Sequence, residues 1–498
     1  MFGVTVDTDR LEYDIHSLVK AFYPEETVKV ISPSTDPAKA EELKAYVRMR
    51  IRLNRSKPLL TFEGGGADGK EKTYEGPDMD VQADHKMPAG VETNIDKNQI
   101  KAFLYRALED YTGKSLPWGN LTGIRPTKIA MGMLEEGKSD AEIGHFMKTA
   151  HFVSDEKIGL SIEIAHRERE LLAPLHVKEG YSLYIGIPFC PTTCLYCSFT
   201  SYPIAAYHKL VEQYLDCVCR EMAYVAEAYR GKVLDSVYIG GGTPTTLTAG
   251  ELDRLLTCLE RTFDLSHLLE FTVEAGRADS ITTDKLRTLK DHGVTRISVN
   301  PQTMKDETLR LIGRRHTVEQ VKEAFAMARN AGFENINMDM ILGLPGEDVE
   351  DVRHTITEIT RLKPDSLTVH SLAVKRASKL RKWIEENGIS CLNNTDETMA
   401  VAAAGAREMG MDPYYLYRQK NMSGNFENVG YARPGKYGIY NILIMEELQT
   451  IVALGAGSIT KRVYPDGRIE RCDNVKDVGL YIEKIDEMIE RKRRLLEE

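Results

Sequence analysis

The sequence contains no run of 18 or more apolar residues, whereas a helix that crosses a bilayer needs about 20. It has no excess of positive charge either, because 65 lysines and arginines stand against 75 aspartates and glutamates, for a net charge of −10. No long basic stripe is present, so a nucleic-acid partner is disfavoured. The first residues, MFGVTVDTDRLEYD, show neither the positive nor the apolar region of a secretion signal. We therefore expect a cytoplasmic protein without a membrane span.

Cysteine is scarce, with 8 in 498 residues, yet Cys190, Cys194 and Cys197 are crowded into the segment GIPFCPTTCLYCSFTSYP. A reducing cytoplasm keeps thiols free, so this group indicates metal binding or catalysis rather than disulfides. Structural zinc takes four closed ligands, usually as two separated pairs, and no second pair follows here. Three thiolates with one open position suit a [4Fe–4S] cluster that binds a further ligand.

The pattern of apolar residues changes along the chain and predicts four regions. The first is mixed α/β, with strands FGVTVDT and TVKVIS on either side of a helix and a polar, glycine-rich loop over 64–80. The second is helical. The third alternates strands and helices, and the fourth loses that alternation but has a hairpin signal at Pro465-Asp466-Gly467. The predicted boundaries are 1–95, 96–178, 179–372 and 373–498.

The third region carries the clearest structural signal. Short β-rich runs alternate there with helical segments such as TVEQVKEAFAMARNAG, and six strand–helix units in a row predict a parallel sheet with right-handed crossovers. Six units are fewer than the eight of a closed barrel, so a partial barrel and an open doubly wound sheet are both compatible with the pattern. The expected strands are 181–187, 233–240, 268–275, 294–300, 335–342 and 365–372.

Unusual residues gather at the carboxyl ends of these strands. The cysteines follow the first strand, and the run Gly240 to Pro244 follows the second. Glu274 ends the third strand, Gln302 follows the fourth, and Asp339 and His370 lie on the fifth and sixth. Parallel α/β barrels build their active sites at this edge. Each residue also has a plainer interpretation as a turn, a cap or a buried carboxylate, but their shared location favours a site.

The pattern C-x3-C-x-Y-C, with Tyr196 before the last cysteine, resembles the signature of the radical S-adenosylmethionine (SAM) superfamily. The resemblance implies that Cys190, Cys194 and Cys197 bind a [4Fe–4S] cluster whose fourth iron chelates SAM, and that electron transfer then yields a 5′-deoxyadenosyl radical. It also implies a partial (β/α)6 barrel. The full expected fold is thus α/β: that barrel, a mixed α/β and helical N-terminal region, and a smaller C-terminal α+β subdomain.

The segments YIGIPFC, YIGGGTPT, IGRRHT and INMDMILGLPGE resemble, in the same order, the oxygen-independent coproporphyrinogen III oxidase family, which includes haem chaperones. The resemblance implies that Tyr184 stacks beside SAM and that Asp339 accepts hydrogen bonds from its ribose hydroxyls. Tyr184, Glu274 and Arg314 are the implied catalytic residues. The implied cofactor-binding residues are Tyr184, Gly241, Gly242, Thr243, Glu274, Gln302, Arg314 and Asp339.

Two positions depart from the established decarboxylases of the family. Gly186 stands where they carry a histidine, and Phe199 stands where they carry a fourth cysteine; the haem chaperones share that phenylalanine. The segments RQKN at 418–421 and ALGAGSITK at 453–461 lack the histidine that relatives place there. The segments flanking the barrel are most similar to the HemZ-type branch, generally described as coproporphyrinogen dehydrogenase.

The function implied is oxidative decarboxylation of two propionates of coproporphyrinogen III to vinyl groups, which gives protoporphyrinogen IX. The alternatives are a haem-delivering chaperone and radical methyl transfer to haem with ring opening. The implied partners are a porphyrinogen or other tetrapyrrole and a reduced flavodoxin or ferredoxin-type electron donor. The substrate carries four carboxylates, so cations are expected to bind it, and the candidates are Arg277, Arg315, Lys375 and Arg418.

Overall fold

The computed structural model describes residues 1–54, 56–63, 71–78, 97–123, 125–375, 378–388, 392–419 and 426–497. Within these ranges the chain forms two compact units, Met1–Ala165 and His166–Glu498. None of the helices in the described ranges has the length and apolar character that crossing a membrane requires.

The first unit contains a five-stranded sheet in the order β2-β1-β3-β4-β5. The expected strand–helix–strand start of the chain is confirmed, and β1 and β2 pair in parallel. The sheet also takes in β5, inside the segment expected to be a loop, so that expectation was wrong for these four residues; residues 64–70 and 79–80 lie outside the described part. The elements are β1 (Phe2–Val6), α1 (Glu12–Phe22), β2 (Val28–Ile31), α2 (Pro37–Lys44), β3 (Val47–Arg52), β4 (Leu59–Phe62) and β5 (Lys72–Glu75).

Helices follow this sheet, as the sequence predicts. Trp118, in the connection between the first two of them, is fully buried, which agrees with a loop packed by its tryptophan. Helix α5 begins at a capping box in which the Ser139 side chain accepts from the Glu142 N–H, and this satisfies a donor that the helix itself leaves unpaired. The helices are α3 (Lys97–Thr112), α4 (Thr127–Glu135), α5 (Asp140–His151) and α6 (Asp155–Leu172).

Helix α6 runs across the boundary between the units, and its end belongs to the core of the second unit. Leu172 and Leu175 pack there with Tyr414 and Leu443, and Arg167 lies 3.3 Å from Asp412.

This packing gives a prediction for two fragments of the chain. We expect a fragment that begins at residue 155 to unfold cooperatively. A fragment that begins at residue 178 should be less stable by about 3–6 kcal/mol, because the two buried leucines are lost. Denaturant unfolding followed by circular dichroism tests this, and equal midpoints and slopes for both fragments would contradict it.

The second unit is built on an eleven-stranded sheet in the order β14-β15-β13-β12-β11-β10-β9-β6-β16-β17-β18. All six predicted strands are present, and they pair in parallel with their neighbours in the chain. In the described part of the chain the two end strands of the sheet do not pair with each other, so the barrel is partial, as expected. These strands are β6 (Gly180–Ile187), β9 (Val233–Gly241), β10 (Glu270–Gly276), β11 (Arg296–Val299), β12 (Ile336–Leu342) and β13 (Ser366–Ser371).

Segments after residue 373 extend both edges of this sheet. β16 adds to β6 in parallel, and β15 adds to β13 in antiparallel orientation. The predicted hairpin at Pro465-Asp466-Gly467 is confirmed, since β17 and β18 pair on either side of it. The additional strands are β14 (Asp412–Tyr417), β15 (Asn428–Ala432), β16 (Thr450–Leu454), β17 (Ile459–Val463) and β18 (Ile469–Asp473), and a short pair, β7 (Phe189–Cys190) with β8 (Tyr202–Pro203), closes the cysteine loop.

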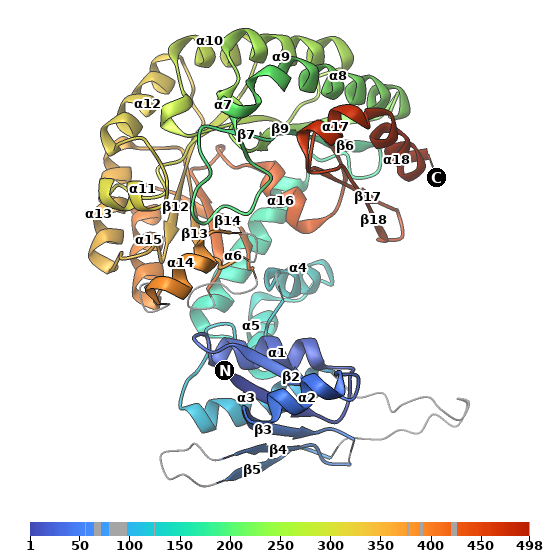
Figure 1. Cartoon of the computed structure of the whole chain (residues 1–498), viewed down its shortest axis with the longest axis vertical. Helices are drawn as coiled ribbons and strands as arrows, with labels where there is room; N and C mark the ends of the chain where they lie inside the picture. The colour runs from blue at the N-terminus through green and yellow to red at the C-terminus, as the bar shows by residue number, and fades with distance from the viewer. Residues whose placement is uncertain are drawn as a thin grey trace. The chain divides into compact units, whose positions relative to one another are not determined.

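Helices cover the outer face of the strands in an arc (Figure 1). Helix α13 shows why they form: Asp348 caps its first N–H groups, and Val352, Ile356 and Ile359 recur on one face and are buried. The covering helices are α8 (Val211–Ala228), α9 (Ala249–Thr262), α10 (Thr283–Asp291), α12 (Val318–Asn330), α13 (Val349–Leu362) and α15 (Asp396–Glu408). Shorter or peripheral ones are α7 (Ile204–Tyr207), α11 (Asp306–Leu311), α14 (Leu380–Asn387), α16 (Ile439–Glu446), α17 (Val478–Glu483) and α18 (Ile485–Glu497).

Candidate active site

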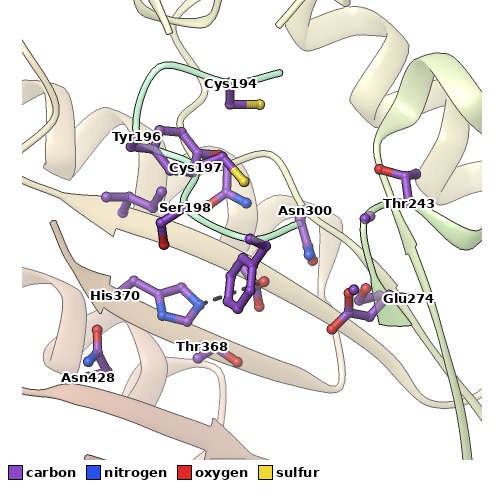
Figure 2. A pocket seen from close by; sticks show the side chains of 18 of the residues that line it. Cys194, Tyr196, Cys197, Ser198, Thr243, Glu274, Asn300, Thr368, His370 and Asn428 are labelled. Carbon is purple, nitrogen blue, oxygen red and sulfur yellow. Dashed lines mark ion pairs between the residues drawn. The ribbon is translucent and has the colours of Figure 1, made fainter. Parts of the chain in front are cut away.

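A cavity of about 380 Å³ opens among the carboxyl ends of the parallel strands. Figure 2 shows the thiols of Cys194 and Cys197 on one side of it and Glu274, Asn300 and His370 across from them. Ten of the eleven predicted site residues line this cavity: Cys190, Cys194, Cys197, Gly241, Gly242, Thr243, Glu274, Gln302, Arg314 and Asp339.

The cysteine loop is held in place by hydrogen bonds to backbone carbonyls of another segment. Its Leu195 N–H donates to Ile312 O at 2.9 Å, and the Thr192 hydroxyl donates to Gly313 O at 2.9 Å. Within the loop, the Cys197 N–H donates to Cys194 O at 3.2 Å and forms a turn. The loop is thus fixed by residues that follow β11, and its three thiols are presented to one space.

The thiols lie in a poorly hydrated environment. The Cys190 sulfur is 3.4 Å from the Thr243 hydroxyl, and Arg277 Nη1 is 3.8 Å from the Cys194 sulfur. Burial raises the pKa of Cys190 to about 11 and raises the pKa of Cys197 as well. Thiolates at these positions therefore need a cationic partner such as iron.

The donor set fits an iron–sulfur cluster better than a single ion. No three His, Cys, Asp or Glu side chains in the described ranges are arranged to hold one metal ion. A [4Fe–4S] cluster instead takes one thiolate at each of separate irons. Three thiols on one loop, two of them buried and the third half-buried, suit such a cluster.

A glycine-rich turn forms the wall beside the cysteines. The Gly242 N–H donates to Ile187 O at 2.8 Å, and the Thr243 N–H donates to Phe189 O at 2.7 Å. A Cβ at Gly242 would lie 2.6 Å from Phe189 O, so only glycine allows this close approach. Gly241 adopts φ 104°, which also favours glycine.

Two carboxylates that line the cavity, Glu274 on β10 and Asp339 on β12, have pKa values shifted in opposite directions. Burial, together with the charge of Asp339, raises the pKa of Glu274 to about 7, although Tyr238 donates a hydrogen bond to it. Burial also acts on Asp339, but His370 and a 2.7 Å hydrogen bond from Asn337 outweigh it and lower the pKa of Asp339. The His370–Asp339 pair, at 3.7 Å, is the dashed line in Figure 2.

Two buried acceptor atoms in the cavity are free to accept hydrogen bonds from a ligand. Among the described residues, Gln302 Oε1 and Asn300 Oδ1 are buried and have no partner. Gln302 is held at φ 68° because its N–H donates to Asp339 O and its carbonyl accepts from the Ile341 N–H, both at 2.9 Å. Strained backbone of this kind persists where the surrounding structure fixes it, and it occurs often at binding sites. These acceptors fit the amino group and hydroxyls of SAM.

Comparisons with known proteins agree with this geometry. The radical SAM superfamily model matches residues 184–359. The oxygen-independent coproporphyrinogen-III oxidase-like protein HemZ of Bacillus subtilis is 38% identical over 99% of this chain and 97% of its own length. The chain belongs to the oxygen-independent coproporphyrinogen III oxidase-like family of the radical SAM superfamily.

Other members of this family carry two kinds of name. The haem chaperone HemW of Bacillus subtilis is 38% identical over 39% of this chain and 51% of its own length. The solved structure of HemN, the coproporphyrinogen III oxidase of Escherichia coli, superposes with a TM-score of 0.51 at 22% identity and covers 64% of this chain and 72% of that one. Radical SAM membership implies a [4Fe–4S] cluster and SAM as cofactors, whereas the names differ on the activity.

Tyr184 is the predicted site residue that does not line the cavity. Its ring stacks on those of Tyr238 and Tyr440, with centroids 6.2 Å apart in each case, and a Cβ at Gly241 would lie 3.1 Å from its hydroxyl. Its role as a coenzyme contact stays a prediction. Arg314 lines the cavity, where it donates to Asn300 O at 2.6 Å and to the Tyr196 hydroxyl at 3.3 Å, and so ties the cysteine loop to the end of β11.

Only some of the four basic residues expected to bind the substrate lie at the cavity. Arg277 and Lys375 line the cavity, and Arg315 and Arg418 do not. Arg277 is also engaged by Asp279 and Thr192, so it serves the cysteine loop. Sequence reasoning placed Asn300 at the end of the fourth strand but missed other lining residues, namely Tyr238, Arg296, Ser298, Asn337, Thr368 and Asn428. Several of them alternate along one strand, as in RISVN, and this period of two was the available signal.

Glu274 gives a pH-dependent prediction for stability in the absence of SAM. Its pKa is about 7 in the folded protein and near 4.5 when unfolded, so the folded state holds more protons between these values and stability falls as pH rises through them. We expect Glu274→Gln to raise the free energy of unfolding at pH 8 by at most about 3 kcal/mol, and to change it little at pH 5, as denaturant unfolding at the two pH values would measure. Equal effects at both pH values would contradict this.

Proposed function

We propose that this protein is a radical SAM enzyme that acts on a tetrapyrrole with propionate groups, and that its reaction is the oxygen-independent conversion of coproporphyrinogen III to protoporphyrinogen IX. The observation that carries the proposal is the single cavity shared by three thiols of one loop and by the acceptors of four parallel strands. The oxidase-like name of the relative that spans nearly the whole chain supports the same reading.

Residues of the cavity have separable tasks in this proposal. Cys190, Cys194 and Cys197 would hold the cluster. Glu274, Gln302 and Asp339 would accept hydrogen bonds from SAM, and Arg314 would keep Tyr196 and the cysteine loop in place. Bound together, the two cofactors supply a carbon-centred radical that can remove a hydrogen atom from a substrate. A one-electron donor of the flavodoxin or ferredoxin type is the partner that this chemistry requires.

The outer part of the cavity offers groups suited to a tetrapyrrole. Phe199 is 68% exposed although it lines the cavity, and the Lys375 ammonium lies 5.1 Å from the centre of its ring. An exposed aromatic face packs well against a flat or puckered macrocycle, and an ammonium group can pair with a propionate. Phe199 and Lys375 therefore support a substrate of this class.

The second candidate function is haem delivery, which the chaperone names of some relatives favour. Haem iron commonly takes an axial histidine. Among the described residues that line the cavity, the histidine is His370, and it is paired with Asp339. His316 is buried and does not line the cavity. This arrangement favours turnover of a metal-free tetrapyrrole over storage of haem.

An anaerobic assay separates the two functions. Reconstituted protein is incubated with SAM, a reductant and coproporphyrinogen III, and products are analysed by mass spectrometry. We expect loss of carbon dioxide, vinyl products and 5′-deoxyadenosine, together with no stoichiometric haem complex in a parallel titration. A saturable one-to-one haem complex with no decarboxylation would overturn the proposal in favour of the chaperone, and a methylated or ring-opened haem product would replace it with the third alternative.

A further inference from the structure

The two ends of the cavity, along the direction of its strands, carry different polar groups. Arg296 and Ser298 on strand β11, and Asn300 directly after it, line the cavity at alternate positions. Asn300 lies at the carboxyl end, near the cysteines, and Arg296 lies four residues earlier, about 13 Å along the strand. The carboxyl end holds acceptors, including Asn300 Oδ1 and Gln302 Oε1, whereas Arg296 places a donor with a full positive charge at the floor.

Arg296 is buried without the partners that a guanidinium normally has. Only 2% of the residue is exposed, and it lines the cavity. Among the described residues its one hydrogen bond runs from Nη2 to the Ser366 hydroxyl at 3.1 Å, and its Nε has none. It forms no ion pair within 4.0 Å in the described part of the chain. A guanidinium has five N–H donors, and leaving them unpaired in a buried place is costly.

The carboxylates around Arg296 interact with it only through space, because none of those described forms an ion pair with it. Glu270, on the adjacent strand β10, accepts from the Tyr440 N–H at 3.2 Å and from the Thr272 hydroxyl at 2.6 Å. Glu270 therefore acts on Arg296 through space, and the hydroxyl-bearing side chains of Tyr238, Tyr414 and Tyr415 lie around the guanidinium. Ser298 Oγ, one step up the strand, also lacks a partner among the described residues. Arg296, with one hydrogen bond, and Ser298, with none among the described residues, thus face the same lower part of the cavity.

We propose that the floor of this cavity is an anion-binding subsite in which Arg296 binds a carboxylate of the ligand, with the Ser298 hydroxyl as a second donor. A planar guanidinium and a carboxylate can pair through two parallel hydrogen bonds, and this pairing is strongest where water is excluded. The inference rests on the proposed function in one respect, since it assigns the carboxylate to a propionate of the tetrapyrrole. SAM also carries a carboxylate, and the experiment separates the two sources.

The test compares the binding of two ligands, an acid and its amide, to the wild type and to variants of Arg296. Binding of coproporphyrin III, the stable oxidised macrocycle, and of its tetraamide is measured by fluorescence on anaerobic, reconstituted protein containing S-adenosylhomocysteine. We expect the wild type to prefer the acid over the amide, and Arg296→Gln to lose about 10- to 100-fold of that preference. Arg296→Lys, which keeps the charge but not the planar fork, should lie between them. Arg261→Gln, an exposed arginine on α9, is the matched control.

Each outcome decides the proposal. Equal binding of acid and amide by the wild type overturns it without any variant, and so does an unchanged preference in Arg296→Gln or, should that variant not fold, in Arg296→Lys. Weakened SAM binding in calorimetry with an unchanged porphyrin preference reassigns the carboxylate to SAM and overturns the assignment to the substrate. An Arg296-dependent preference in a protein that releases no carbon dioxide would uphold the subsite while the proposed reaction fails.

Discussion

Cys190→Ala is expected to abolish cluster assembly and, with it, all SAM cleavage. Anaerobic reconstitution of the unaltered protein should give about four iron and four sulfide ions per chain. In the variant both should fall to near zero, the absorbance near 400 nm should vanish, and 5′-deoxyadenosine should drop to the level of a blank. The physical reason is that alanine offers no ligand, and Cys190 is a buried thiol on β7, which pairs with β8 and places the sulfur 3.4 Å from the Thr243 hydroxyl.

Other thiols of the chain provide the control for this result. Cys217 lies on α8, where its sulfur is 3.9 Å from Ile482 O, and Cys472 lies on β18. Neither lines the cavity. Cys217→Ala and Cys472→Ala should therefore keep the iron, the sulfide and the SAM cleavage of the wild type. Iron and sulfide counts near four in Cys190→Ala would remove that residue from the ligand set.

The barrel was predictable from the sequence because its signal is repeated. Each of the six strands found lies within two residues of the expected range, since buried apolar runs alternate with helices whose apolar face and caps are both visible. The same repetition located most of the site. A polar residue at the end of one strand says little, but polar residues at the ends of six parallel strands must meet at one edge.

Other elements depended on partners that the sequence did not reveal. Strand β16 is a short apolar run outside the strand–helix rhythm, and its pairing with β6 exists only once the sheet is assembled. Strand β5 has mostly exposed side chains and is a strand because β4 supplies its hydrogen bonds. Tyr440 comes from α16, so its stacking with Tyr184 could not be foreseen. The place of Arg296 inside the cavity depends on the pairing register of β11, which the sequence alone did not reveal.

Asp339→Asn is expected to weaken SAM binding by about 5- to 150-fold, a cost of about 1–3 kcal/mol, while the cluster stays intact. Asp339 lies on β12 inside the cavity, and one of its oxygens is already used by Asn337, at 2.7 Å. A carboxylate still has acceptor sites for two ribose hydroxyls after that bond, whereas an amide keeps one oxygen and must turn its NH2 group toward the ligand or toward His370. The loss is therefore specific to a ligand that donates hydrogen bonds.

Anaerobic calorimetry with SAM measures this loss, and iron and sulfide counts verify that each sample carries its cluster. Asp284→Asn makes the same chemical change on the exposed first turn of α10, so it should bind SAM like the wild type. The ligand provides a second comparison, because an analogue of S-adenosylhomocysteine without ribose hydroxyls should bind equally to the wild type and to Asp339→Asn. Unchanged SAM affinity in Asp339→Asn with a full cluster would exclude the carboxylate from the binding site. A loss as large for the analogue as for the parent compound would mean instead that Asp339 acts by shaping the cavity rather than by accepting from the ribose.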